Sequence, residues 1–151
     1  MKISVWIGRS RIAGKGLFIA QDIPQGTRII PYRGEKISKE ESTKRLARSN
    51  AYIFTFNTRW DIDGKLLSNK ARYINHSCDP NCTVEITTRT IWIVANRDIT
   101  AGEELTYNYG YELDEEDAHP CICGATQCCG FILAPQYWGL LRNNKVATAA
   151  R

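Results

Sequence analysis

The stretch Arg72-Tyr73-Ile74-Asn75-His76-Ser77-Cys78 decides which fold we expect for this chain of 151 residues. Two further motifs follow it, Glu104-Leu105-Thr106-Tyr107-Asn108-Tyr109 and then Cys121-x-Cys123-x4-Cys128. Any one of the three could occur by chance. Because all three occur in this order in so short a chain, we interpret them as parts of one functional unit.

The composition limits the chain to one globular domain. Its 151 residues suffice for a single domain with a core and are too few for two of usual size. No apolar run approaches the ~20 residues that span a bilayer, so we do not expect a membrane protein. Residues 1–6 lack the apolar core of a signal peptide, which predicts a reducing compartment. The net charge of +4 is mild, and no basic tract indicates direct binding to nucleic acid.

Acidic side chains are concentrated in one run near the third motif. Five of the six residues from Glu112 to Asp117 are acidic. A run of like charges is most often a solvated loop. The alternative is a negatively charged rim that attracts a basic peptide.

Residue patterning predicts a mostly β domain with a few short helices. Apolar alternation or β-prone composition predicts strands over residues 3–7, 17–20, 27–30, 52–56, 90–95 and 104–109. A hairpin is predicted to turn through Asp63-Gly64. Ser38 and Glu41 have capping-box spacing, which predicts a helix over residues 39–48. A second short helix is predicted within residues 131–141.

The cysteines indicate a metal site. Four of the six crowd into residues 121–129, and tight clusters without a signal peptide are more often metal sites than disulfides. Zinc takes four tetrahedral ligands, with sulfur at about 2.3 Å. Cys121, Cys123 and Cys128 can supply three of them. The residues alone leave four candidates for the remaining ligand, namely Cys78, Cys82, Cys129 and His119. Free or disulfide-bonded cysteines are the alternative to a metal site.

Taken together, the three motifs resemble those of the SET-domain protein-lysine methyltransferases that carry a zinc-binding post-SET tail. The resemblance runs from about Ser10 to Ile132. It implies a SET β-clip with a threaded, pseudoknot-like segment over residues 1–112. A post-SET zinc-binding region and C-terminal segment would follow over residues 113–142, and a disordered tail over residues 143–151. The resemblance also implies that the zinc ligands are Cys78, Cys121, Cys123 and Cys128.

The cofactor implied by the resemblance is S-adenosylmethionine, with S-adenosylhomocysteine as its product. Glycines in the loop around residues 14–16 would let the backbone approach this cofactor, because no Cβ intrudes. Taken alone, the same loop is an ordinary turn. The full set implied to bind the cofactor is Gly14, Lys15, Gly16, Leu17, Phe18, Tyr52, Arg72, Asn75, His76, Tyr109 and Phe131. Trp138 is an alternative to Phe131 as a cover for the adenine.

The resemblance also implies a narrow aromatic channel for the substrate lysine. Its catalytic residues would be Tyr109, Tyr107, Tyr32 and Phe54. Tyr109 would orient the amine, and the hydroxyl of Tyr107 would leave less room for extra methyl groups. Core packing is the alternative role of each aromatic side chain. An apolar channel favours the neutral amine, because desolvation disfavours the ammonium form.

The function implied is protein-lysine N-methylation of a histone tail or similar basic peptide, mainly mono- or dimethylation. Two other functions compete, a catalytically silent SET-like module that binds peptides or partner proteins, and a zinc-stabilised interaction domain without a cofactor. We expect the nucleus or chromatin for a eukaryotic protein, and the cytoplasm or delivery to a host for a bacterial one. Three departures from the family are a missing cysteine-rich pre-SET region, a short insert over residues 34–72, and Asn108 in place of a common aspartate.

Overall fold

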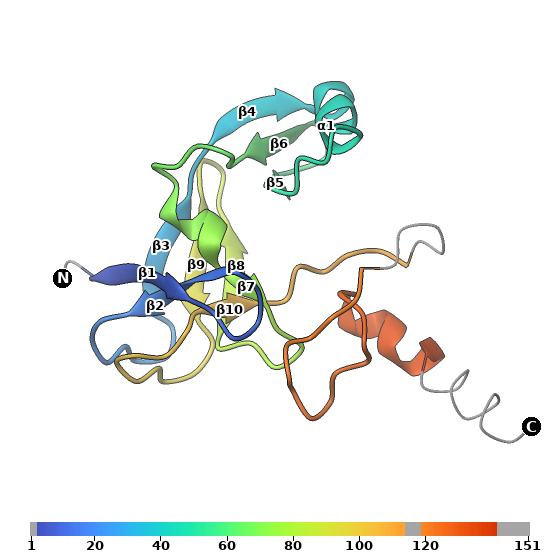
Figure 1. Cartoon of the computed structure of the whole chain (residues 1–151). Coiled ribbons are helices and arrows are strands. Elements are labelled where there is room, and N and C mark those ends of the chain that lie inside the picture. Colours follow the sequence, from blue (N-terminus) through green and yellow to red (C-terminus); the bar gives the residue numbers. More distant parts are fainter. Residues whose placement is uncertain (1–2, 114–118, 142–151) are drawn as a thin grey trace, which may run out of the picture.

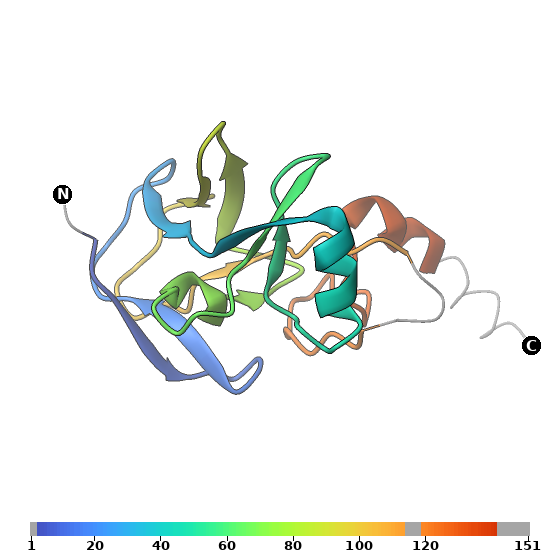
Figure 2. The ribbon, with the colours of Figure 1, turned by 90° about the horizontal axis from the view of Figure 1, so that it is seen from above.

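The computed structural model describes residues 3–113 and 119–141 (Figure 1). The expected tail at residues 143–151 and residues 114–117 of the acidic run lie outside the described residues. In two views at right angles, the hairpin near the N-terminus lies at one end of the molecule. The segment with the cysteine motif lies at the other end (Figures 1 and 2).

The described strands form four small sheets rather than one large sheet. Two sheets have two strands, β1-β2 and β10-β7, and two have three strands, β3-β9-β8 and β4-β6-β5. Only the pairing of β10 with β7 is parallel. The strands are β1 Val5–Arg9, β2 Lys15–Ile19, β3 Arg28–Tyr32, β4 Glu35–Ser38, β5 Ile53–Thr55, β6 Trp60–Asp63, β7 Asn75–His76, β8 Cys82–Ile86, β9 Ile91–Ala95 and β10 Thr106–Tyr107.

The core lies where these sheets meet. Strand β9 is rich in β-branched residues and runs between β3 and β8, so both of its edges are paired. Ile93 at its centre is fully buried, as is Leu17 of β2. Leu105, next to β10, is also fully buried, and its amide donates to the carbonyl of Leu17 at 2.7 Å. The second motif is thereby attached to the N-terminal hairpin.

Helix α1 (Lys39–Leu46) begins where the sequence predicts and ends two residues early. The Ser38 hydroxyl accepts from the Glu41 amide at 3.2 Å, which is the first half of the predicted capping box. The Glu41 carboxylate accepts instead from Arg45, one turn later, at 2.7 Å. Arg45 also donates to the buried Asp63 of β6 at 2.6 Å and thereby attaches the helix to its sheet.

The predicted hairpin turn at Asp63-Gly64 is wrong. Strand β6 ends at Asp63, and the β5–β6 hairpin turns earlier, where the Asn57 side chain accepts from the amides of Arg59 and Trp60. Gly64 is needed for close packing rather than for a turn. A Cβ there would lie 2.4 Å from a ring carbon of Tyr32.

Two short 3₁₀ helices complete the described elements. The first, η1 (Lys70–Tyr73), leads directly into β7. The second, η2 (Pro135–Tyr137), continues as helix over residues 138–141, so the short helix predicted within residues 131–141, with Pro135 near its start, begins at Pro135. Strands β4, β7 and β8 were not predicted.

Replacing Ile93 with alanine should lower the free energy of unfolding by about 2–5 kcal/mol, because a cavity would remain in the middle of the core. Urea denaturation followed by circular dichroism measures this loss. The control is Leu67→Ala, since Leu67 is 75% exposed and its truncation should change the stability by no more than about 0.5 kcal/mol. Equal effects of the two substitutions would contradict the assignment of the core.

Candidate active site and metal centre

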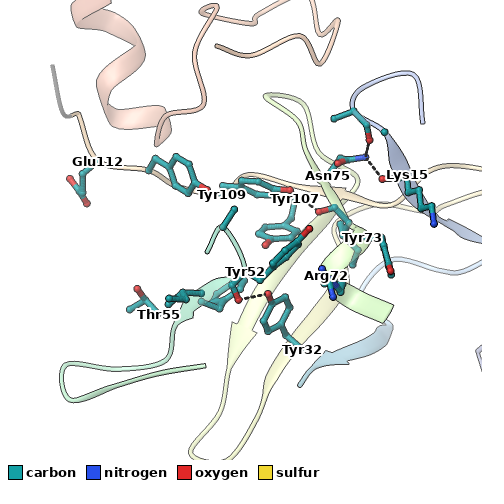
Figure 3. Close-up of a pocket in the computed structure, with 18 residues that line it drawn as sticks. Lys15, Tyr32, Tyr52, Thr55, Arg72, Tyr73, Asn75, Tyr107, Tyr109 and Glu112 are labelled. Carbon is teal, nitrogen blue, oxygen red and sulfur yellow. Dashed lines mark hydrogen bonds between the residues drawn. The ribbon is translucent and has the colours of Figure 1, made fainter. Parts of the chain in front are cut away.

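A pocket of about 870 Å³ lies where the first two motifs meet the glycine loop and β5 (Figure 3). It extends from residues 13–15 of the loop to residues 107–112. The predicted cofactor and channel residues that line it are Gly14, Lys15, Tyr32, Tyr52, Phe54, Arg72, Asn75, Tyr107 and Tyr109. The pairing of β7 with β10 brings together the two motifs that supply four of these side chains, Arg72, Asn75, Tyr107 and Tyr109.

Aromatic rings form a continuous series along one wall of the pocket. The ring centroids are 5.1 Å apart for Tyr32 and Phe54, and 5.7 Å apart for Phe54 and Tyr107. The series continues from Tyr107 to Tyr109 at 4.9 Å and on to Tyr111 at 5.7 Å. Such spacings are typical of packed aromatic pairs. This wall is apolar in its ring faces and carries phenol groups at several points.

Two phenols of the wall have defined hydrogen-bond partners, and three have a raised pKa. The Tyr32 hydroxyl donates to the Tyr52 carbonyl at 2.8 Å, and the Tyr109 hydroxyl donates to the Ile74 carbonyl at 2.9 Å. Burial raises the pKa of Tyr32, Tyr107 and Tyr109 above the usual value of the phenol. At neutral pH each is therefore an uncharged hydroxyl.

Asn75 anchors the glycine loop. Its amide nitrogen lies 3.1 Å from the carbonyl oxygen of Lys15 and 2.8 Å from a carboxylate oxygen of Glu104 (Figure 3). Glu104 in turn accepts from the Ser10 hydroxyl at 2.8 Å. A Cβ on Gly16 would lie 2.4 Å from the same carboxylate, so a larger residue there would require the Glu104 side chain to move. The sequence analysis missed both Ser10 and Glu104.

His76 points away from the pocket. Its side chain is 3% exposed, and burial lowers its pKa to about 4, so the ring is neutral at physiological pH. The Nδ1 atom lies 3.1 Å from the backbone nitrogen of Tyr109, and the Nε2 atom lies 3.5 Å from the sulfur of Cys78. The ring therefore lies between the aromatic wall and the cysteines.

Four further residues predicted to bind a cofactor do not line the pocket. Leu17 is fully buried in the core, and Gly16 packs on Glu104. Phe18 stacks on Trp6 with ring centroids 4.4 Å apart. Phe131 forms a β-bridge with Pro120. Their cofactor contacts stay predictions.

Several lining residues were not predicted, and one of them had a signal in the sequence. Tyr111 continues the alternation of Tyr107 and Tyr109 and lies on the same side. The others are Ala13, Ala51, Ile53, Thr55, Tyr73, Ile74, Gly110 and Glu112. Tyr73 and Ile74 lie inside the first motif and Glu112 begins the acidic run, but none of these eight was predicted to line the pocket.

Arg72 carries the positive charge nearest to the aromatic residues of the pocket. Its guanidinium lies 4.0 Å from the centroid of the Tyr52 ring, within the range of a cation–π contact. The buried Nε atom has no hydrogen-bond partner among the described residues. Arg72 therefore retains one donor for a ligand or a water molecule.

The four cysteines predicted as zinc ligands lie together. The sulfur atoms of Cys78, Cys121, Cys123 and Cys128 all lie within 4.8 Å of one another. The sulfur of Cys78 is 3.9 Å from that of Cys121 and 3.7 Å from that of Cys128. A zinc tetrahedron with bonds of about 2.3 Å requires sulfur atoms about 3.8 Å apart, so the cluster fits this metal.

Within the cluster, burial raises the pKa of Cys78 and Cys121, and of these three cysteines only Cys123 lies in surroundings that favour the thiolate without a metal. Burial alone would raise the pKa of Cys123, but hydrogen bonds to its sulfur, including one from the Cys78 amide at 3.4 Å, lower it to about 7. Of the other three ligand candidates, Cys82 and Cys129 are buried elsewhere, and His119 packs on the ring of Tyr111. None of the three belongs to the cluster.

A family model described as the SET domain matches residues 14–110. The chain belongs to the SET-domain family. It is 41% identical over 138 residues to human histone-lysine N-methyltransferase 2D, covering 84% of this chain and 2% of that protein. It is 40% identical over 143 residues to the Saccharomyces cerevisiae histone-lysine N-methyltransferase described as H3 lysine-4 specific, covering 87% of this chain and 13% of that protein. The chain thus spans a small part of the length of these relatives.

Solved structures support the same fold. A humanized mutant of Chaetomium thermophilum Polycomb Repressive Complex 2 with a bound inhibitor superposes with a TM-score of 0.66. The two chains are 36% identical, and the match covers 73% of this chain and 15% of the other. The predicted fold class is thereby confirmed. Within residues 3–113 and 119–141, no helix has the length and apolar character needed to cross a membrane.

Replacing Cys123 with serine should abolish tight metal binding, because three thiolates and a hydroxyl no longer form the four-sulfur site. Elemental analysis of the purified protein should find one zinc per chain in the wild type and much less in the variant. Cys129→Ser is the matched control, since Cys129 lies outside the cluster, and it should retain the metal. Loss of zinc from both variants, or from neither, would contradict the proposed ligand set.

Proposed function

We propose that this chain is an S-adenosylmethionine-dependent protein-lysine N-methyltransferase that acts on a histone tail or similar basic peptide. One observation carries the proposal. A single pocket is bordered by the anchored glycine loop and by a series of aromatic rings that includes Tyr109. The family membership and the printed names of the relatives support the same activity.

The residues near the glycine loop fit the cofactor. Asn75 and the backbone of residues 13–15 border one part of the pocket, and the Tyr52 ring with the Arg72 guanidinium borders another. We infer that these groups hold the amino-acid and adenosine parts of the molecule. When bound, S-adenosylmethionine supplies an electrophilic methyl group on a sulfonium. The unpartnered Nε of Arg72 offers one donor for recognition of this ligand.

The aromatic wall would prepare the lysine for reaction. Attack requires the neutral amine, and deprotonating a lysine with a pKa of ~10.4 costs about 3 kcal/mol near pH 8. Apolar ring faces lower that cost, because they disfavour the charged ammonium. The ammonium gives its proton to bulk water before attack, and the rings then exclude water from the neutral amine. Orientation and exclusion of water account for most of the catalysis in such a displacement.

Tyr109 is proposed to orient the amine. Its hydroxyl hydrogen is donated to the Ile74 carbonyl, so the lone pairs of the oxygen remain available to an N–H of the substrate. An N–H held in this way aims the nitrogen lone pair along one direction. The raised pKa of this phenol keeps it in the neutral form that makes both contacts.

The number of methyl groups transferred is proposed to depend on Tyr107. This residue is 9% exposed and packs between Phe54 and Tyr109. Its hydroxyl can bond the amine or an ordered water and reduces the space beside it. Mono- and dimethyl-lysine would then be the main products.

The substrate and location follow from the relatives and stay proposals. Relatives described as H3 lysine-4 specific suggest a histone tail as the substrate and chromatin as the location. The carboxylate of Glu112 borders the pocket and would favour a basic peptide. No direct contact with nucleic acid or membrane is part of this proposal.

Tyr109→Phe should lower kcat by roughly 100-fold or more, because the amine would no longer be held in position. The measurement is transfer of a radiolabelled methyl group to core histones, combined with calorimetry of S-adenosylmethionine binding. Leu67→Ala is the control, since Leu67 is 75% exposed and lies outside the pocket, and it should keep the wild-type rate. A wild-type chain that binds the cofactor and peptide but transfers nothing would favour the silent binding module. A chain that binds no cofactor would favour the zinc-stabilised interaction domain.

Tyr107→Phe should shift the products towards trimethyl-lysine, because the hydroxyl that restricts the space beside the amine is removed. Mass spectrometry of a histone H3 peptide after exhaustive reaction gives the distribution of products. The wild-type chain and the Leu67→Ala control should give the same mono- and dimethylated products. An unchanged distribution in an active Tyr107→Phe enzyme would show that another group limits the number of methyl groups.

A further inference from the structure

The short parallel ladder between β7 and β10 ends in an unusual way. The Ser77 amide donates to the Tyr107 carbonyl at 3.2 Å, as a parallel ladder requires. A continued ladder would next bond the Tyr109 amide to a main-chain carbonyl. That amide instead donates to Nδ1 of the His76 ring at 3.1 Å. A side chain therefore sets the position of the backbone at Tyr109.

This hydrogen bond assigns the hydrogen of the imidazole. A backbone N–H can only donate, so Nδ1 must carry a lone pair and cannot carry a hydrogen. The hydrogen of the neutral ring is then on Nε2. The nearest polar partner of Nε2 is the sulfur of Cys78 at 3.5 Å, so the ring donates an N–H···S hydrogen bond. The two nitrogens thus have opposite roles on opposite sides of the ring.

The ring has little freedom to adopt another orientation. Its side chain is almost fully buried, and it packs edge-on against the ring of Tyr109 with centroids 5.4 Å apart. A flipped ring would leave the Tyr109 amide or Nε2 without its present partner. A buried polar group without a partner is costly, because the hydrogen bonds it made to water are not replaced, so the observed orientation is favoured.

We propose that His76 is a positioning residue that couples the cysteine cluster to the catalytic tyrosine. The coupling runs from the Cys78 sulfur through the imidazole to the backbone amide of Tyr109. This inference rests on the proposed function, in which Tyr109 holds the amine. It gives the His76 side chain a task distinct from the predicted cofactor contact.

The coupling makes the position of Tyr109 depend on the state of the cluster. A cysteine that binds zinc is a thiolate, and a thiolate accepts a hydrogen bond more strongly than a thiol does. Filling the cluster therefore strengthens the bond that orients the ring. The ring in turn holds the amide of Tyr109, whose hydroxyl is fixed at its other end by the Ile74 carbonyl.

Two substitutions separate the two halves of the coupling. In His76→Asn, the side-chain oxygen takes the place of Nδ1 and can accept from the Tyr109 amide, but nothing reaches Cys78. In His76→Gln, the side-chain nitrogen takes the place of Nε2 and can donate to Cys78, but nothing accepts from Tyr109. Each variant thus keeps one contact and loses the other.

The two variants should give opposite results. His76→Asn should weaken zinc binding about 10- to 100-fold in a competition titration with a chromogenic chelator, while most of kcat is retained in the zinc-saturated protein. His76→Gln should keep nearly wild-type zinc affinity but lose up to roughly 100-fold in kcat, with little change in KM for the peptide. Its Tyr109 amide should exchange with solvent faster than in the wild type. Equal losses of zinc affinity and kcat in both variants would overturn the proposal.

A measurement on the wild-type chain does not depend on any variant folding. Ring ¹⁵N spectra of histidine distinguish a protonated nitrogen from an unprotonated one. In the zinc-loaded protein, His76 should carry its hydrogen on Nε2 and none on Nδ1. A hydrogen on Nδ1 would overturn the proposal even if both variants were inactive.

These readouts also separate this inference from the proposed function. Ring protonation, zinc affinity and amide exchange require no methyl transfer. If the chain transfers no methyl group to any peptide while these three results are as expected, the coupling stands and the proposed enzymatic function fails. If methyl transfer is observed and the ring carries its hydrogen on Nδ1, the function stands and the coupling fails.

Discussion

The parallel pairing of β7 with β10 is the interaction on which the candidate site depends. Only two residue pairs make it, Thr106 with Asn75 and Tyr107 with His76. So short a ladder contributes little stability by itself, because each net hydrogen bond supplies only about 1 kcal/mol. It persists because its flanks are buried, with Ile74 before β7 and Leu105 before β10 both almost fully inaccessible. The core thus holds together two motifs that are about thirty residues apart in the sequence.

The wall of the pocket depends on close packing of Tyr32, at the end of β3, against the segments around Tyr52 and Gly64. The Tyr32 hydroxyl reaches the carbonyl of Tyr52, and the Gly64 amide donates to that same carbonyl at 2.9 Å. Gly64 also lies against the Tyr32 ring with no room for a Cβ. The sheet β4-β6-β5, which packs against α1, is therefore attached to β3 beside the residues that it contributes to the pocket. Ion pairs from Arg45 maintain the shape of that sheet from the other side.

The sequence predicted those features that depend on residues close to one another in the chain. The Ser38 cap, the β-branched strand β9 and the crowded cysteines could each be inferred from neighbouring residues. The choice of Cys78 as the fourth cysteine came only from the family resemblance, because it depends on a contact across more than forty residues. The turn at Asp63-Gly64 was wrong for a related reason. Glycine is required at position 64 because a side chain there would clash with the ring of Tyr32, which is distant in the sequence, and not because the chain turns at this point.

The same limit explains which site residues were missed. Glu104 and Ser10 resemble ordinary surface residues in the sequence, and their importance lies in a hydrogen-bonded contact with Asn75. Lining residues such as Ala13 and Ile74 contribute through the main chain, which carries no sequence signal. The aromatic residues were predictable because alternation along a strand places side chains on one side, and Tyr111 could have been added on the same argument.

The four consecutive residues 75–78 have a consequence for how this protein can change in evolution. Asn75 faces the glycine loop, His76 the opposite side, and Cys78 the cysteine cluster. Three different parts of the structure thus contact side chains of a single tetrapeptide, and the spacing of these side chains is fixed. One inserted or deleted residue would reverse the facing of everything beyond it, because side chains alternate along an extended chain. An insertion or deletion within residues 75–78 would therefore remove either Asn75 from the glycine loop or Cys78 from the cysteine cluster.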